Sequence, residues 1–214
     1  MDKTYKDQVR TCDTLLTRKR VFQPNKTAIL FVDVQKSELT DSVKKNHSDY
    51  YNTIVEKAIP NQQTLLKASR ALSVETIYTV IESLTLDGRD RGIDHKLSNL
   101  FIPKGSYMGE VIDEVKPDID DIVITKTSSG VFNSTNIEYV LRNIGIEDII
   151  VVGFLTDQCV DMAIRDGADK GFYMTCVSDA CATYSKERHL QALKAFGGYC
   201  RVMTTNETIA NFAN

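Results

Sequence analysis

The sequence contains few of the residues that hold metals in proteins. Its 214 residues include three histidines, and its five cysteines contain no C-x-x-C pair. No paired-histidine motif occurs either, so we expect no metal centre built from protein ligands, and no cofactor. Because five is an odd number, complete pairing of the cysteines within the chain is excluded.

Long apolar runs and an excess of basic charge are also absent. No stretch approaches the roughly 20 apolar residues that cross a bilayer, so we expect no membrane insertion. The 26 Lys and Arg residues against 29 Asp and Glu residues give a net charge of −3, which argues against nucleic acid as a partner. The first ten residues, M-D-K-T-Y-K-D-Q-V-R, lack the apolar core of a signal peptide. These features favour a cytoplasmic protein with free thiols.

The composition is otherwise that of an ordinary globular protein. Hydrophobic residues make up 42% and charged residues 26%, which is enough for a sizeable core. We find no internal repeat and no low-complexity linker. The expected organisation is a polar arm, residues 1–26, followed by a single domain, residues 27–214. We expect the basic triplet at residues 18–20 of the arm to be solvated.

Short apolar runs rich in β-branched residues alternate with segments of helical periodicity. This alternation predicts an α/β fold, in which a parallel sheet is covered by helices on both faces. The expected strands are residues 27–35, 75–81, 121–125, 149–152, 171–177 and 199–203. The expected helices are residues 48–72 (with a break or restart at Pro60), 109–115, 135–143, a segment from 157, 185–196, and a last helix with a capping box that ends at 212.

Cys159 lies at the turn between a buried strand and a helix. It follows the apolar run at 149–152 and the turn G-F-L-T-D-Q, and we expect Thr156 or Asp157 to cap the helix. The partial positive charge of a helix N-terminus favours thiolate over thiol, so a cysteine here is expected to be nucleophilic. The alternative is a small buried hydrophobe, the role expected for Cys176, whereas Cys181 is expected in a loop.

Two further polar residues stand at the carboxyl ends of expected strands. Asp33 ends the first apolar run and Lys126 follows the third. Because carboxyl ends of parallel strands meet at one edge, we expect both residues near Cys159. A carboxylate and an ammonium offset each other's burial, and both bind a thiol or thiolate. This set predicts hydrolysis in which Cys159 attacks a carbonyl carbon, Asp33 moves the proton, Lys126 balances the charge, and backbone N–H groups of the turn receive the oxyanion.

These residues resemble a known family. V-D-V-Q at 32–35, Lys126 after its strand and G-F-L-T-D-Q-C-V at 153–160 are similar to the isochorismatase-like cysteine hydrolases, over residues 27 to 212. The resemblance implies a doubly wound three-layer sandwich with a six-stranded parallel sheet of order 3-2-1-4-5-6, and an Asp33-Lys126-Cys159 triad. It also implies a cis peptide at Phe154-Leu155, with the N–H groups of Leu155 and Cys159 as the oxyanion hole. Because family members often assemble as dimers or tetramers, we expect a homodimer or homotetramer.

Departures from the family pattern narrow the expected substrate. Nicotinamidases carry an Asp/His metal cluster after the second strand, where this chain has Glu82 and L-T-L-D-G-R-D-R-G, with no histidine before His95. True isochorismatases have a small residue at the position of Cys159. D-G-R-D-R, T-D-Q-C-V and D-A-C-A-T-Y-S-K-E-R-H look most similar to biuret-type or other ureide and amide hydrolases.

We therefore expect a metal-independent amidohydrolase that cleaves a C–N bond of a small amide or ureide. Biuret-like, ureidoacrylate-like and N-carbamoyl compounds are the candidate substrates, cleaved through a thioester to release ammonia or an amine. The alternatives are vinyl-ether hydrolysis on the same fold and a non-catalytic binding protein.

The loop at residues 83–107 is expected to form a wall or lid over the site, since long loops after strands are often functional. Arg89 and Arg91 are candidates to bind a polar or anionic substrate, with surface ion pairs as the alternative. Gln158 is expected either to meet a carbonyl or urea group or to bind nearby backbone. Glu82 and Phe132 complete the candidate substrate contacts.

Overall fold

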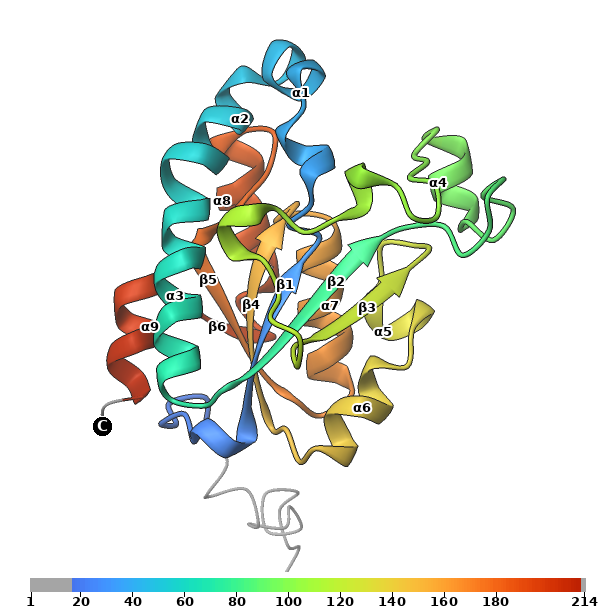
Figure 1. The fold of residues 1–214 in the computed structure, drawn as a ribbon. Helices are drawn as coiled ribbons and strands as arrows, with labels where there is room; N and C mark the ends of the chain where they lie inside the picture. Colours follow the sequence, from blue (N-terminus) through green and yellow to red (C-terminus); the bar gives the residue numbers. More distant parts are fainter. Residues whose placement is uncertain (1–16, 213–214) are drawn as a thin grey trace, which may run out of the picture.

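The computed structural model describes residues 17–212, so most of the expected arm lies outside the described residues. Its centre is a six-stranded parallel sheet with the order β3-β2-β1-β4-β5-β6 (Figure 1). This confirms the predicted architecture and strand order. The strands are β1 (Thr27–Val32), β2 (Glu75–Ile81), β3 (Ile122–Lys126), β4 (Asp148–Phe154), β5 (Tyr173–Ala182) and β6 (Cys200–Met203).

Helices cover both faces of the sheet, so every residue of the central strands β1 and β4 is buried. One core layer packs beneath α2, α3 and α9, and the other beneath α5 to α8. Burial on both faces explains why these strands are continuously apolar in the sequence. The helices are α1 (Asp41–Asn46), α2 (Ser48–Thr53), α3 (Ile59–Ala71), α4 (Ile93–Leu97), α5 (Val131–Ser134), α6 (Ile137–Asn143), α7 (Cys159–Asp169), α8 (Lys186–Phe196) and α9 (Thr205–Phe212).

Several predicted helix boundaries hold for identifiable reasons. A π-helical segment, Ile54–Ala58, joins α2 to α3 immediately before Pro60, where the sequence predicted a break or restart of the helix. The predicted capping box forms at α9, because Glu207 accepts from the Thr204 N–H at 2.7 Å and the Thr204 side chain accepts from the Glu207 N–H at 3.3 Å. No helix within residues 17–212 has the length and apolar character needed to span a bilayer.

The prediction of a helix at residues 109–115 was wrong. Two 3-10 turns, Tyr107–Gly109 and Asp113–Val115, flank Val111, which forms an antiparallel bridge with Gln35. The bridge draws this segment across the end of β1 as extended backbone. The segment therefore belongs to the edge of the sheet at which the strands end.

Cys181 lies in a strand rather than in the expected loop. β5 runs on to Ala182 through an irregularity in its pairing with β4, where the register shifts between Val151 and Gly153. The polar residues Ser178 and Asp179 fall within this shifted stretch, which made the strand look shorter in the sequence. The described cysteines, Cys159, Cys176, Cys181 and Cys200, are all free and buried.

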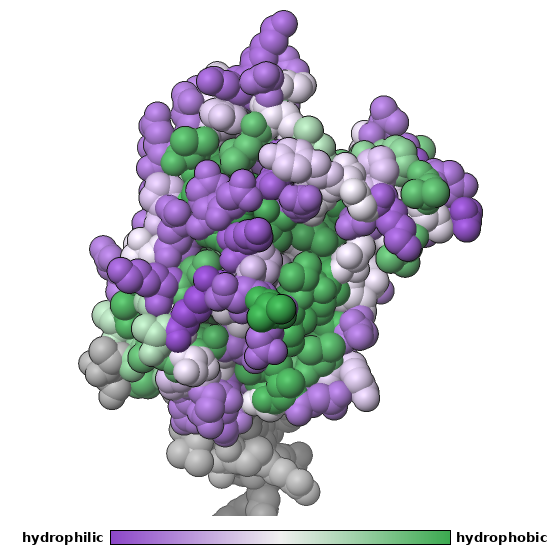
Figure 2. Space-filling model, viewed as in Figure 1, coloured by the Kyte–Doolittle hydropathy of each residue, from purple (hydrophilic) through white to green (hydrophobic). Residues whose placement is uncertain are grey.

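The loop that carries α4 projects from the body of the molecule (Figure 1). In Figure 2 its surface is a mixture of hydrophobic and hydrophilic residues. The exposed apolar side chains of this loop are Leu84, Leu86, Ile93, Leu97 and Phe101.

A partly buried cluster of charged side chains lies at the opposite edge of the sheet, where the strands begin. Arg20 contacts Glu147 at 2.8 Å and Asp148 at 3.2 Å, and its guanidinium lies 4.0 Å from the centre of the Tyr173 ring. The prediction of a solvated basic triplet was therefore wrong for Arg20. Asp148 is fully buried, and burial raises its pKa to about 6 although Arg20 and Arg201 oppose the shift.

This shift predicts a pH-dependent stability. The pKa of Asp148 is raised from 3.8 to about 6 in the folded protein, so the folded state favours the protonated carboxyl group. The stability gained from this protonation is complete below pH 3.8 and is lost as pH rises through about 6. The Asp148→Asn variant lacks this titration. Urea unfolding should therefore show wild type losing about 3 kcal/mol relative to Asp148→Asn between acid and neutral pH, at about 1.4 kcal/mol per pKa unit. A difference that does not change with pH would contradict this expectation.

Candidate active site

Asp33 stands immediately after β1 in a left-handed backbone conformation, with φ of 53°. Its N–H donates to the carbonyl of Thr79 at 3.0 Å, and the Thr79 hydroxyl donates to Asp33 Oδ1 at 3.0 Å. Gly153 of β4 has room only for hydrogen at this point, since a Cβ there would lie 2.1 Å from the Val32 carbonyl oxygen. The close approach of β1 and β4 therefore fixes where the carboxylate sits.

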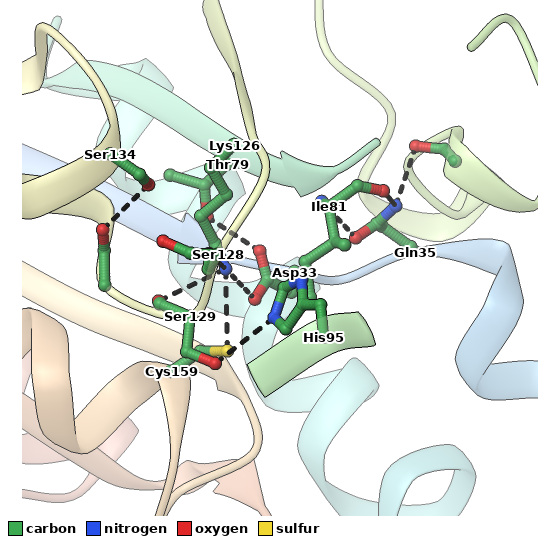
Figure 3. Close-up of polar contacts among 12 residues, drawn as sticks. Asp33, Gln35, Thr79, Ile81, His95, Lys126, Ser128, Ser129, Ser134 and Cys159 are labelled. Carbon is green, nitrogen blue, oxygen red and sulfur yellow. Dashed lines mark hydrogen bonds and ion pairs between the residues drawn. The ribbon is translucent and has the colours of Figure 1, made fainter. Parts of the chain in front are cut away.

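Lys126, the last residue of β3, has a fully buried side chain. Its Nζ lies 2.8 Å from Asp33 Oδ2 and 3.5 Å from Cys159 Sγ (Figure 3). It also donates to the carbonyl oxygens of Ser128 at 3.0 Å and Ser129 at 3.2 Å. The ammonium thus has oxygen partners on two sides and sulfur on a third, which offsets the cost of burying its charge.

Cys159 begins α7 and has 6% of its surface exposed. The prediction that Thr156 or Asp157 caps this helix was wrong, because Gln158 is the N-cap residue and makes no side-chain cap. Thr156 instead contacts His189 Nδ1 at 2.9 Å, and Asp157 accepts from Arg188 at 2.5 Å. The turn is therefore anchored to α8.

The backbone of this turn has unused donors. The Phe154-Leu155 peptide is cis, as the resemblance implied. Within residues 17–212 we find no acceptor for the N–H groups of Leu155 or Cys159, whereas the Leu155 carbonyl accepts from Gln158 and Val160 at 3.1 and 3.2 Å. Two N–H groups beside the sulfur are thus free to bind an oxygen atom.

The electrostatics of the site differ from the sequence-based expectation of a thiolate. Burial raises the pKa of Cys159 to about 12, and the negative charge of Asp33 adds to the rise, while Lys126 opposes it. Burial lowers the pKa of Lys126, but Asp33 and Cys159 outweigh it and the net pKa is raised. The resting site therefore holds a neutral thiol beside an ammonium, since the helix N-terminus does not offset burial next to a carboxylate.

The structure adds four residues that sequence reasoning missed. Thr79 binds Asp33, and Gln35 ties the end of β1 to Ile81 and to the Gly109 carbonyl. The His95 Nε2 lies 3.3 Å from the hydroxyl of Ser129, which borders the sulfur (Figure 3). Gln35 belongs to the V-D-V-Q motif and was thus open to prediction, whereas His95 and Ser129 carry no spacing signal.

The two arginines expected to bind substrate make contacts within their own loop. Arg89 is exposed and pairs with Asp87 at 3.0 Å, which matches the ion-pair alternative. Arg91 donates to the carbonyls of Gly88 and Leu100 and lies over the Phe101 ring, so it holds the loop together.

Of the three other candidate substrate contacts, two have structural partners and one has a free side chain. Glu82 accepts from the Gly105 N–H at 2.6 Å, which also ties the loop down. Phe132 packs in the core beside Phe172, with 5.9 Å between ring centres. Gln158 is exposed next to Cys159, and its side chain makes no hydrogen bond with any residue in the described range 17–212.

Among residues 17–212, no group of three or more His, Cys, Asp or Glu side chains is arranged to hold a metal ion.

Comparison with known proteins identifies the family. The model of the isochorismatase domain matches residues 27–208. The chain is 26% identical to ureidoacrylate amidohydrolase RutB of Agrobacterium fabrum over 174 residues, which cover 74% of this chain and 76% of the relative. It is 27% identical to nicotinamidase 3 of Arabidopsis thaliana over 186 residues, covering 85% and 86%. The chain therefore belongs to the isochorismatase family and is a hydrolase.

A solved structure agrees with this assignment. A cysteine hydrolase from Pseudomonas syringae pv. phaseolicola 1448A superposes with a TM-score of 0.79 and 26% sequence identity, covering 90% of this chain and 94% of that one. The fold and the family predicted from the sequence are thus confirmed.

The buried ion pair between Asp33 and Lys126 predicts how the free energy of unfolding should change in single and double variants. Lys126→Met leaves the Asp33 carboxylate buried without its cation, and breaking such a pair costs about 3–5 kcal/mol. The double variant Asp33→Asn, Lys126→Met should recover most of this loss, because it buries no unpaired charge. Urea unfolding at neutral pH measures both values, and a double variant no more stable than Lys126→Met would contradict the expectation.

Proposed function

We propose that this hydrolase is a cysteine amidohydrolase that cleaves the C–N bond of a small amide or ureide through a thioester. The observation that carries the proposal is the position of Lys126 Nζ, 2.8 Å from Asp33 and 3.5 Å from Cys159, at the edge where the strands end. A neutral thiol next to a carboxylate is suited to attack that is coupled to proton transfer.

The chemistry follows from these positions. The thiol proton moves to Asp33 as Sγ attacks the carbonyl carbon, and Lys126 stabilises the negative charge that forms. The N–H groups of Leu155 and Cys159 bind the oxyanion, and one such donor is typically worth about 3 kcal/mol. Asp33 then returns the proton to the departing nitrogen, which leaves as ammonia or an amine. Water hydrolyses the thioester by the reverse sequence.

The relatives favour C–N bonds as the target. Their printed names include ureidoacrylate amidohydrolase, nicotinamidase and N-carbamoylsarcosine amidase. A thiol at position 159 suits carbonyl attack, whereas vinyl-ether hydrolysis has no carbonyl carbon for it to attack. Ureides are the favoured substrates within this class, and two side chains with polar atoms unpaired among residues 17–212, Glu38 and Gln158, support that choice.

Glu38 lies near enough to Asp33 for the Asp33 charge to contribute to the pKa of its carboxyl group. Its Oε2 accepts from the Tyr50 hydroxyl at 2.7 Å, and its Oε1 makes no hydrogen bond with any residue in the range 17–212. Burial raises the pKa of Glu38 to about 7; the Tyr50 hydrogen bond opposes the rise and the Asp33 charge adds to it. Tyr50 packs edge-on against Phe154 of the cis peptide. A free carboxylate oxygen here fits the N–H groups of a ureide, and Gln158 is free to bind its carbonyl.

A substrate panel tests the proposal. Wild type should release ammonia from at least one of biuret, ureidoacrylate or an N-carbamoyl amino acid. Cys159→Ala should lose about 10⁴-fold or more in kcat, because the nucleophile is gone. Cys181→Ala is the matched control, since it removes a buried thiol outside the site, and it should retain activity. Full turnover by Cys159→Ala would refute the proposal, and so would a wild type that cleaves no amide or ureide.

Glu38 gives a second, independent expectation. Glu38→Gln should raise KM for ureides about tenfold through loss of a charge-assisted hydrogen bond, with little effect on kcat. Simple amides that lack a distal N–H group should be unaffected, and so should the control Glu114→Gln on the surface. In wild type, KM for ureides should rise as pH falls through about 7, where Glu38 takes up a proton. An unchanged KM would remove Glu38 from substrate binding.

A further inference from the structure

The helix α4 buries its histidine and exposes its aliphatic residues. Ile93 and Leu97 are 73% and 80% exposed, whereas His95 between them is 2% exposed. Burial of apolar surface would favour the opposite arrangement. A polar contact must therefore hold His95 inward, and that contact lies at the active site.

The contact of His95 is the hydroxyl of Ser129. His95 Nε2 lies 3.3 Å from Ser129 Oγ (Figure 3). Figure 3 shows the Ser129 hydroxyl beside the sulfur of Cys159, where it opposes the rise in the thiol pKa that burial causes. The backbone carbonyl of Ser129 accepts from Lys126 at 3.2 Å. Ser129 thus contacts His95 and Lys126 and lies beside the sulfur of Cys159.

The segment of Ser129 is fixed to α4 by its backbone as well. The N–H of Gly92, the residue before α4, donates to the carbonyl of Thr127 at 2.8 Å. A Cβ at Gly92 would lie 3.2 Å from Ser128 Cβ, so the two segments pack closely. α4 is therefore anchored to the loop that surrounds the Lys126 ammonium.

Proton counting assigns the tautomer of His95. A serine hydroxyl has one proton, so if Ser129 donates to Sγ it must accept from His95 Nε2–H. The imidazole is neutral, because burial lowers its pKa and the Lys126 charge lowers it further, against smaller opposing effects of Asp94 and Asp33. Nδ1 is then an acceptor, and it is buried without a hydrogen-bond partner in the described part of the chain.

We infer that His95 is a positioning residue that points the Ser129 hydroxyl at Cys159 and so stabilises the thiolate from a side that Lys126 does not occupy. In the reacting state the thiol proton moves to Asp33, while the protons of Ser129 and His95 stay in place. Sγ then receives one hydrogen bond from Lys126 and one from Ser129. This inference rests on the proposed function only in requiring that Cys159 react as a thiolate.

Alkylation of Cys159 by iodoacetamide tests the inference without a substrate. Peptide mass spectrometry gives the rate at Cys159 alone, as a function of pH. Ser129→Ala and His95→Leu should each slow alkylation about tenfold near neutral pH and shift the pH–rate profile upward, because a hydrogen bond to a charged group is lost. His95→Gln places an amide N–H near the position of Nε2–H and should restore most of the rate.

Two further variants separate positioning from a structural role. The double variant His95→Leu, Ser129→Ala should react as slowly as Ser129→Ala, because His95 acts through the hydroxyl. Leu97→Ala, on the exposed face of α4, should react like wild type. Thermal unfolding checks that each variant is folded, and Ser129→Ala keeps the test valid if His95→Leu is not.

The inference would be overturned by a wild-type rate and pH profile in His95→Leu or Ser129→Ala, or by effects that multiply in the double variant. Its failure is distinct from failure of the proposed function. A wild type that hydrolyses no amide or ureide, yet shows these alkylation rates, contradicts only the proposed function.

Discussion

The buried ion pair between Asp33 and Lys126 is the interaction on which the site depends. Burying either charge without a partner would cost several kcal/mol of desolvation free energy, so each requires the other. Together the two charges set the electrostatic environment of Cys159. The pair joins the ends of β1 and β3, which are separated by β2 in the sheet. Function and stability are therefore coupled at this point, since a change that breaks the pair leaves a buried charge as well as an altered thiol.

The same pair explains why the thiol is protonated at rest. The Asp33 carboxylate and burial raise the pKa of Cys159, and Lys126 compensates only in part. A reactive thiolate would then arise only together with proton transfer to Asp33, when the bound substrate offers its carbonyl carbon. Hydrogen-bond donors around the sulfur, from Lys126, Ser129 and the turn at Leu155, suit the charge of that state rather than of the resting one.

Much of the site was predictable because it follows from the periodicity of the sheet. Asp33 and Lys126 follow apolar runs, and parallel strands place such positions at one edge. The contributions of loops were not predictable in this way. Glu38 comes from a 3-10 turn after β1, His95 from a short helix, and Ser129 from the loop after β3. Their positions depend on how the loops cross the edge at which the strands end, and the spacing of residues in the sequence does not predict those paths.

The sequence by itself determined the layers of the fold and the meeting of an acid, a lysine and a thiol, because hydrophobic periodicity and the geometry of parallel strands depend on local patterns of residues. The strand order was implied by the resemblance to a known family. Tertiary structure alone decided the protonation of Cys159, the N-cap of α7 and the inward turn of His95. These depend on burial and on partners distant in the chain. Desolvation is a property of the packed molecule, and it outweighed the helix N-terminus that the sequence made visible.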